Sequence, residues 1–459
     1  MKTPNPTILP VLLAALALPA FCSAAEPAKR PNIVLIMADD QGWGDTGYNG
    51  HPELKTPHLD EMARSGLRLN RFYAGHFNCS PTRGSVLTGR HPNRYGTFSP
   101  GAPFRVQELT VAEVLKSAGY ATGHFGKWHL NGIRGPGQPI ATDDPLSPGR
   151  NGFEEWVSVS NFYDLDPLMA RNGVAEQFKG DSSDVATEEA LKFIRHQAEQ
   201  GKSFLSVVWF GSPHVPHRAL PADKAAYSAL PKSEQEYYGE LTAIDRSVGR
   251  LRAALRELKI AENTIVWYCS DNGGAFGPKS TGSLRGSKGT LWEGGVRVPG
   301  ILEWPARIGA PFVSEVPCST LDIYPTVLAA TGVKAERQIQ PLDGVSLLPL
   351  LDRKMESRGK AIPFWGHAGG PPGHATLLDW PYKLHKNAVA FRGKKAPGEV
   401  LPTVLLYDVS KDPRETADLV ARQPERVAKM TAELEAWQAS VEKSLAGGDY
   451  PASASDPKP

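Results

Sequence analysis

Three continuous apolar runs, each ending in or near polar residues, constrain the fold of this 459-residue chain more than any other feature. They read PNIVLIMADD (31–40), SFLSVVWF (203–210) and NTIVWYCSDN (263–272). A run without polar alternation is typical of a strand buried on both faces, as in a parallel sheet. Amphipathic segments at 184–201 and 233–259 lie between or beside these runs. Strands that alternate with helices predict an α/β sandwich around a large, mostly parallel sheet.

A further helix is predicted within LTVAEVLKSAGY (109–120). Thr110 and Glu113 have the spacing of a capping box, in which each side chain bonds the other residue's backbone N–H. Leu109 and Val114 are spaced as a hydrophobic staple, and Gly119 is a suitable stop.

From about Pro349 the sequence pattern differs from that of the preceding part of the chain. Strand candidates at 376–386 and 403–410 surround a loop rich in Gly, Pro and Lys. A closing helix is predicted over Pro424–Leu445, because its apolar residues, three and four apart, form one stripe: Val427, Met430, Leu434, Trp437 and Val441. We therefore expect a large α/β domain at 26–348, a small α+β subdomain at 349–447 with an antiparallel sheet covered by this helix, and a disordered tail at 448–459.

Residues 1–25 have the pattern of a secretory signal peptide. One lysine precedes an apolar run from Ile8 to Phe21, and small residues follow up to Ala25. A membrane anchor is the alternative, but the run is shorter than the ~20 residues of a bilayer span. Cys22 suggests a lipoprotein, although Phe21 fits poorly before a lipidated cysteine. We expect an exported protein, periplasmic or extracellular, without stable membrane insertion.

The composition excludes two broad classes of protein. With 41% hydrophobic and 22% charged residues, the chain is not disordered overall. A net charge of +2 does not suggest a nucleic-acid partner.

Acidic and amide side chains follow two of the apolar runs. Asp39 and Asp40 end the first run, and Asp271 and Asn272 end the third. Ligands of parallel sheets collect at the carboxyl ends of strands, so these groups are candidates for one site. Oxygen ligands suit Ca²⁺ or Mg²⁺ rather than zinc. The alternative interpretation is a pair of solvated strand ends.

Cys79 lies in FNCSPTRGSVLTGR (77–90). A phosphatase-type cysteine loop needs more residues between Cys and Arg than are found here, and the local signatures of Cys–His proteases are absent. Pro81 suits a first helical turn, which would place Cys79 at a helix N-terminus that favours an anion. A buried core thiol remains possible.

The sequence does not determine whether the other cysteines are free or paired. Removal of Cys22 with the signal peptide would leave three cysteines, an odd number for an exported protein. The chain has no CxxC pair, so a structural zinc site is not indicated. Cys269 and Cys318 are either paired or simply buried.

The stretch CSPTRGSVLTGR resembles the signature of the formylglycine-dependent sulfatases, in which the cysteine is oxidised to an aldehyde by a separate maturation system. Thr82 stands where serine is commoner. The resemblance extends in the family's order over about residues 31–447, through PNIVLIMADDQGWGD, TPHLDEMARSG, GYATGHFGKWHL, SPHVPH, SDNGG, LRGSKGTLWEGGVRVP, LDIYPTVLAATG and LYDVSKDPRETADL. It implies an alkaline-phosphatase-like fold and a sulfuric ester hydrolase.

The resemblance also implies roles for individual residues. One Ca²⁺ ion, with Mg²⁺ less favoured, would be held by Asp39, Asp40, Asp271 and Asn272. The modified Cys79 would be both a neighbour of the metal and the nucleophile. Arg83 would hold the hydrated aldehyde, Lys127 and Lys288 the sulfate, His129 the diol, and His214 the leaving oxygen. Ser158 and Ser160 are loose candidates for a further contact. His217, Arg285 and His91 lie near these motifs without an assigned role.

These residue types suit sulfate chemistry. Lysines, an arginine and a dication stabilise charge that moves to the bridging oxygen. One hydroxyl of a hydrated aldehyde attacks sulfur, and the other lets the carbonyl re-form and expel sulfate, whereas a serine would remain a stable sulfate ester.

Two other functions compete with this interpretation. One is a phosphomonoester or phosphonate monoester hydrolase of the same fold, and the other is a glycan-binding pseudoenzyme. The variable loops at 131–180, 214–232 and 366–400 would select the substrate. Their basic and aromatic residues, including His367, His374, His385 and Lys386 in the last loop, favour a sulfated glycan.

Overall fold

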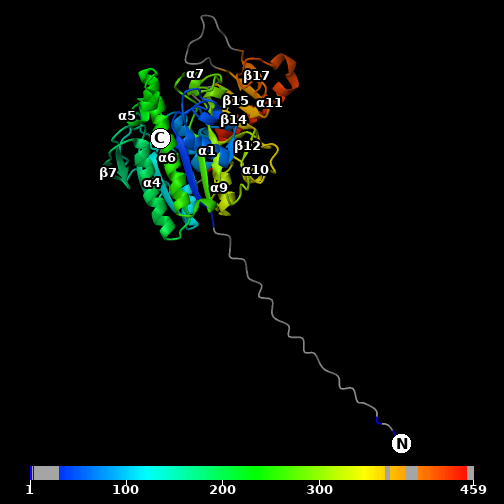
Figure 1. Cartoon of the computed structure of the whole chain (residues 1–459). Coiled ribbons are helices and arrows are strands. Elements are labelled where there is room, and N and C mark those ends of the chain that lie inside the picture. Colours follow the sequence, from blue (N-terminus) through cyan, green and yellow to red (C-terminus); the bar gives the residue numbers. More distant parts are fainter. Residues whose placement is uncertain (3, 5–29, 367–372, 389–401, 452–459) are drawn as a thin grey trace. The chain divides into compact units, whose positions relative to one another are not determined.

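The computed structural model describes residues 1–2, 4, 30–366, 373–388 and 402–451 (Figure 1). Pro31–Pro459 form one compact unit, separate from Met1–Arg30. The predicted signal peptide lies almost wholly outside the described residues, as does His367. Among the described residues, no helix combines the length and apolarity needed to cross a membrane.

The main sheet has ten strands and a parallel centre. The three apolar runs form adjacent strands in the order β9, β1, β8, and each pairs in parallel with its neighbour. The full order is β12 (Phe312–Ser314), β2 (Leu67–Leu69), β11 (Gly300–Glu303), β9 (Thr264–Ser270), β1 (Asn32–Ala38), β8 (Phe204–Trp209), β4 (Ala121–Lys127), β5 (Glu155–Val159), β6 (Leu168–Arg171) and β7 (Val174–Gln177).

Both faces of the sheet are covered. Alternate side chains of β1 enter different cores, with Ile33 and Leu35 in one and Val34 and Ile36 in the other, because successive strand residues point to opposite faces. Burial on both sides explains why the run has no polar alternation. The predicted mostly parallel α/β sandwich is therefore confirmed.

Two sets of helices supply the covering layers. The long helices α4 (Ser182–Glu199) and α6 (Lys232–Glu257) run side by side (Figure 1) and pack with α1 (Pro57–Ser65) on one face. The other face carries α2 (Cys79–Thr88), α3 (Val111–Ser117) and α9 (Ile323–Thr331). The remaining short helices are α5 (Pro221–Lys224), α7 (Gly277–Ser280), α8 (Glu293–Val296) and α10 (Leu348–Leu351).

The predicted capping box is present at α3. The Thr110 side chain accepts from the Glu113 N–H at 3.1 Å, and Glu113 accepts from the Thr110 N–H at 2.8 Å. The helix ends at Ser117, and Gly119 follows with a φ of +89°.

Strand β4 was not predicted, because Gly123, His124 and Gly126 interrupt its apolar pattern. It lies beside β8 and is completely buried. Gly126 has a φ of +110°, and a Cβ there would lie 1.9 Å from the Trp209 carbonyl oxygen. The glycine therefore permits close approach of two backbones just before Lys127.

The predicted C-terminal sheet and its covering helix are both present. The antiparallel sheet has the order β14 (Ile362–Trp365), β15 (Ala375–Asp379), β16 (Tyr382–Lys386) and β17 (Val404–Asp408). Helix α11 spans Pro424–Leu445, as predicted, and buries Met430, Leu434 and Val441 against one face. The opposite face packs on Tyr73, Trp292 and neighbouring residues of the α/β part. The predicted boundary at 349 falls inside α10, whose Leu350 and Leu351 belong to the core of the main sheet.

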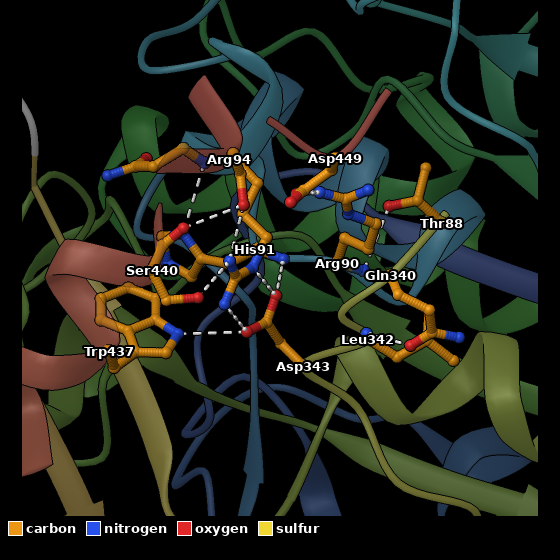
Figure 2. Close-up of polar contacts among 12 residues, drawn as sticks. Thr88, Arg90, His91, Arg94, Gln340, Leu342, Asp343, Trp437, Ser440 and Asp449 are labelled. Carbon is orange, nitrogen blue, oxygen red and sulfur yellow. Dashed lines mark hydrogen bonds and ion pairs between the residues drawn. The ribbon is translucent and has the colours of Figure 1, made fainter. Parts of the chain in front are cut away.

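A buried ionic network joins α11 to the α/β part (Figure 2). Asp343 accepts from Arg94 through both oxygens, at 2.7 and 2.9 Å, and from the Trp437 indole N–H at 3.1 Å. Arg94 also donates to Ser444 at 2.8 Å. These contacts hold the C-terminal helix by charged groups removed from water, so breaking one partner leaves an uncompensated charge.

The first residues of the segment at 448–459, for which disorder was predicted, have defined contacts. Asp449 pairs with Arg90 at 2.6 Å, and the Tyr450 hydroxyl donates to Glu108. The tail after α11 is therefore held at its start by buried polar partners. Residues 452–459 lie outside the described residues.

The state of the cysteines is also decided. A three-stranded sheet, β10 (Arg297–Val298), β3 (Phe72–Tyr73) and β13 (Cys318–Ser319), carries Cys318, whereas Cys269 lies in β9. Cys79, Cys269 and Cys318 are free and buried. The possible pairing of Cys269 with Cys318 is therefore wrong, and both are core thiols.

Candidate active site

The acidic ends of β1 and β9 meet at one edge of the sheet. Asp39 and Asp40 follow β1, and Asp271 and Asn272 follow the neighbouring β9. The Asp40 N–H donates to Asp271 at 3.2 Å, and the Asn272 amide donates to Asp40 at 2.9 Å. The parallel pairing of β1 with β9 thus brings together groups separated by more than 200 residues of chain.

Cys79 is the first residue of α2 and faces this acidic cluster. Its Sγ donates to Asp39 at 3.5 Å, and the side chain is buried. Burial, and then the charge of Asp39, raises the pKa of the thiol. A cysteine that acts directly as a nucleophile needs a lowered pKa, so the unmodified thiol is unsuited to that task.

Three cations surround the acidic groups. Arg83, one turn after Cys79, donates to Asp271 at 2.7 Å and to the Lys127 carbonyl at 3.1 Å. Lys127, at the end of β4, pairs with Asp39. Lys288 pairs with Asp40 at 2.6 Å. The positive charges therefore come from three separate segments of the chain and converge on one cluster of carboxylates.

The two predicted histidines differ in their surroundings. His129 is buried, and its Nδ1 has no hydrogen-bond partner among the described residues. Burial, with Lys127 and Arg83, holds its pKa well below the usual range. A neutral imidazole with an unpaired nitrogen can accept a proton.

His214 lies nearer the surface. Its Nδ1 donates to the Val215 carbonyl at 2.6 Å, which leaves Nε2 toward Asp40 at 3.9 Å. Its ring stacks on Phe162, with centroids 4.9 Å apart. Burial lowers the pKa of His214, opposed by Asp39 and Asp40. The stack and the Val215 bond fix the direction of Nε2.

The acidic cluster has the chemistry of a hard-cation site. Ligand atoms of Asp39, Asp40, Cys79 and Asp271 all lie within 4.8 Å of one another. Burial and the charge of Asp39 raise the pKa of Asp271 to about 7, so the neighbouring cations do not offset the burial of this carboxylate. The Asn272 Oδ1 is buried and has no partner in the described part of the chain. These oxygens fit a divalent ion such as Ca²⁺.

Some predicted neighbours lie elsewhere. Ser158 bonds His124 at 2.7 Å, and Ser160 accepts from the Gln138 N–H at 2.8 Å, so each hydroxyl is engaged away from the cluster. His91 belongs to the Asp343 network, where its backbone N–H donates to the Asp343 carboxylate at 2.7 Å.

Three further residues lie near the site: His217 has a packing role, and the aromatic residues Phe162 and Trp209 were not predicted from the sequence. His217 packs against Tyr237 and Phe276. Phe162 beneath His214, and Trp209 whose ring lies 5.3 Å from the Arg83 guanidinium, were missed because neither lies in a polar motif.

Comparison with known proteins identifies the family. The family model for sulfatases matches residues 31–333. N-acetylgalactosamine-6-sulfatase of Sus scrofa is 34% identical over 390 residues, covering 77% of this chain and 71% of that protein. This chain belongs to the sulfatase family. As a sulfatase, it is a sulfuric ester hydrolase.

Two further similarities extend over most of this sulfatase. Arylsulfatase G of Rattus norvegicus is 32% identical, covering 87% of this chain and 84% of that protein. The crystal structure of Ps i-CgsB in complex with k-i-k-neocarrahexaose superposes with a TM-score of 0.78 at 27% identity, covering 89% of this chain and 93% of the other. The fold expected from the sequence resemblance is therefore confirmed.

Proposed function

We propose that this sulfatase removes a sulfate group from a carbohydrate, with formylglycine made from Cys79 as its nucleophile. The observation that carries the proposal is the placement of Cys79. It lies at the start of α2, within bonding distance of Asp39, in a ring of Arg83, Lys127 and Lys288. Its raised thiol pKa is unfavourable for thiolate chemistry but irrelevant once the residue carries an aldehyde.

The proposed sequence of steps uses the hydrated aldehyde. One of its geminal hydroxyls gives its proton to a carboxylate of the acidic cluster and attacks sulfur, so an S–O bond forms to residue 79 as the S–O bond to the sugar breaks. His214 gives a proton to the departing sugar oxygen. His129 takes the proton of the second hydroxyl, the carbonyl re-forms, and the bond from residue 79 to sulfate oxygen breaks. Water then hydrates the aldehyde again, and proton exchange with solvent returns the two histidines and the carboxylate to their starting states.

The cations of the chain stabilise this reaction electrostatically. Lys127 and Lys288 are positioned to contact peripheral sulfate oxygens, and Arg83 is positioned to hold the diol. They lie in a water-poor site, where such charges act more strongly than in solvent. One Ca²⁺ held by Asp39, Asp40, Asp271 and Asn272 would supply Lewis-acid stabilisation of the sulfate group.

A carbohydrate substrate is supported by the relatives and by the mouth of the site. Relatives named for N-acetylgalactosamine 6-sulfate, and a neighbour solved with a neocarrahexaose, act on or bind sugars according to their names. Near His214, the Phe162 ring, the exposed Val215 and the exposed Arg218 offer aromatic, apolar and cationic contacts to a sulfated glycan. The signal-like residues 1–25 support export, periplasmic or extracellular, and a separate maturation system would supply the aldehyde.

The test compares matched aryl sulfate and aryl phosphate esters. We expect the sulfate ester to be the better substrate, and Cys79→Ala to lower kcat by a factor on the order of 10³ or more. Cys318→Ala, another buried thiol, is the matched control and should keep activity. Full turnover by Cys79→Ala would overturn the mechanism, and faster phosphate hydrolysis would favour a phosphomonoester or phosphonate monoester hydrolase. Desulfation of defined sulfated oligosaccharides then identifies the sugar.

A further inference from the structure

The loop that carries Lys288 touches the active site at three points. The Lys288 ammonium pairs with Asp40 at 2.6 Å, and its backbone N–H donates to the Gly274 carbonyl at 3.0 Å. The next N–H, of Gly289, donates to the Phe77 carbonyl at 3.1 Å, two residues before Cys79. A shift of this loop would therefore move a cation relative to both the nucleophile and the acidic cluster.

Both ends of this loop are bonded to one residue of the C-terminal subdomain. Arg285, at the start, donates to the Glu415 carbonyl at 2.7 Å. Glu293, at the other end, donates its backbone N–H to the Glu415 carboxylate at 2.8 Å. The Gly294 N–H closes the loop onto the Arg285 carbonyl at 2.7 Å. The Arg285 guanidinium also stacks 3.6 Å from the Trp292 ring.

Glu415 is itself held rigidly. It is fully buried and has a φ of +54°, a conformation unusual for a residue with a side chain. Its second carboxylate oxygen accepts from His385 at 2.7 Å and from Lys383 at 3.2 Å, both on β16. Lys383 also pairs with Glu293 at 3.0 Å. The C-terminal sheet thus fixes the position of Glu415, which in turn is bonded to both ends of the Lys288 loop.

We propose that Glu415 is a positioning residue for catalysis, which fixes the ammonium of Lys288 by tying both ends of its loop to the C-terminal sheet. This role rests on the proposed sulfate contact of Lys288. It gives the small C-terminal subdomain a part in the reaction, although Glu415 does not touch the acidic cluster. Buried bonds to both ends of a short loop restrict it more than a bond to one end.

A double-mutant cycle tests the proposal, with kcat/KM measured on an activated aryl sulfate. We expect Glu415→Gln to lower kcat/KM by roughly 10–100-fold, because misplacing a catalytic group by about 1 Å can cost 10²-fold. In a Lys288→Ala background, the same substitution should have little further effect, because the group it positions is gone. Formylglycine content at residue 79 is measured by peptide mass, and rates are normalised to it.

Controls separate positioning from general damage. Leu434→Ala weakens the same subdomain from its α11 face and should leave kcat/KM of the folded enzyme unchanged. If Glu415→Gln does not fold, Arg285→Lys, which disturbs only the first end of the loop, enters the same cycle with the same criteria.

Four outcomes overturn the proposal. The first three are no change in kcat/KM for Glu415→Gln, an equal loss in both backgrounds, and an equal loss for Leu434→Ala. An unchanged kcat/KM for Lys288→Ala would show that Lys288 has no catalytic role and would also overturn the proposal, but it would leave the proposed chemistry at Cys79 intact. Absence of sulfate ester hydrolysis by fully modified wild-type enzyme is a failure of the proposed function instead.

Discussion

At the scale of single residues, Thr82 shows why its position accepts more than one amino acid. Its hydroxyl donates to the His76 carbonyl at 2.9 Å and accepts from the His76 N–H at 3.1 Å. This closes the turn that leads into Cys79. Serine has the same hydroxyl, so a threonine where the family more often has serine preserves the contact.

Replacing Thr82 by valine should therefore destabilise the protein. Thr82→Val keeps the shape but leaves a buried N–H and a buried carbonyl of His76 unpaired, at a cost of about 2–4 kcal/mol in the free energy of unfolding. Thr82→Ser should cost less than about 1.5 kcal/mol. Urea unfolding of the three proteins measures this, and equal stability of the valine and serine variants would contradict the interpretation.

At the scale of elements, helix α11 is attached by charge as well as by its apolar stripe. The Asp343 network in Figure 2 includes His91, whose backbone N–H donates to Asp343 and whose ring packs edge-on against Trp437. Burial lowers the pKa of His91 to about 3, with Arg94 lowering it further and Asp343 opposing. The imidazole is therefore neutral in the folded protein where it would be protonated in the unfolded chain.

This difference predicts a pH dependence of stability. The unfolded chain protonates His91 below about pH 6.5, so stability from this group is present above that pH and is lost as pH falls toward 3. At pH 5 the loss amounts to about 2 kcal/mol. Between pH 7 and pH 5, the free energy of unfolding of His91→Asn should therefore fall by about 2 kcal/mol less than that of the wild type. Urea unfolding at both pH values measures it, and identical losses would argue against a neutral buried imidazole.

At the scale of the whole molecule, an ion held by the acidic cluster would link binding to folding. The carboxylates of this cluster come from the chain just after β1 and just after β9, and these meet only in the folded sheet. An ion bound there stabilises the folded state, because the unfolded chain has no such site.

Calcium should therefore raise the thermal stability of chelator-treated protein. At about 100 times the dissociation constant, the gain is about 2.7 kcal/mol. Asp40→Asn should remove most of this gain, whereas Glu435→Gln, on the exposed side of α11, should keep it. Calorimetry with Ca²⁺ and with Mg²⁺ gives the result. A gain of the same size in Asp40→Asn would place the ion elsewhere.

Sequence alone identified the elements whose patterns are local. The apolar runs, the capping box at Thr110 and the stripe of α11 predicted strands and helices within a few residues, because side-chain direction repeats with the period of each element. The run of motifs around Cys79 identified the family, and two acidic strand ends suggested one site. Strand β4 escaped notice because its glycines and polar residues hide the strand pattern.

Only the tertiary structure decided which distant groups meet. The fold placed Asp271 beside Asp40, left Cys269 and Cys318 unpaired, and directed Ser158 and Ser160 to other partners. The tie from Glu415 to the loop of Lys288, and the lowered pKa of His91, depend on burial and contacts across more than 100 residues. Local sequence patterns indicate whether a segment is buried. Tertiary packing determines which residues surround it, and the protonation and charge of the groups in a site depend on those surrounding residues.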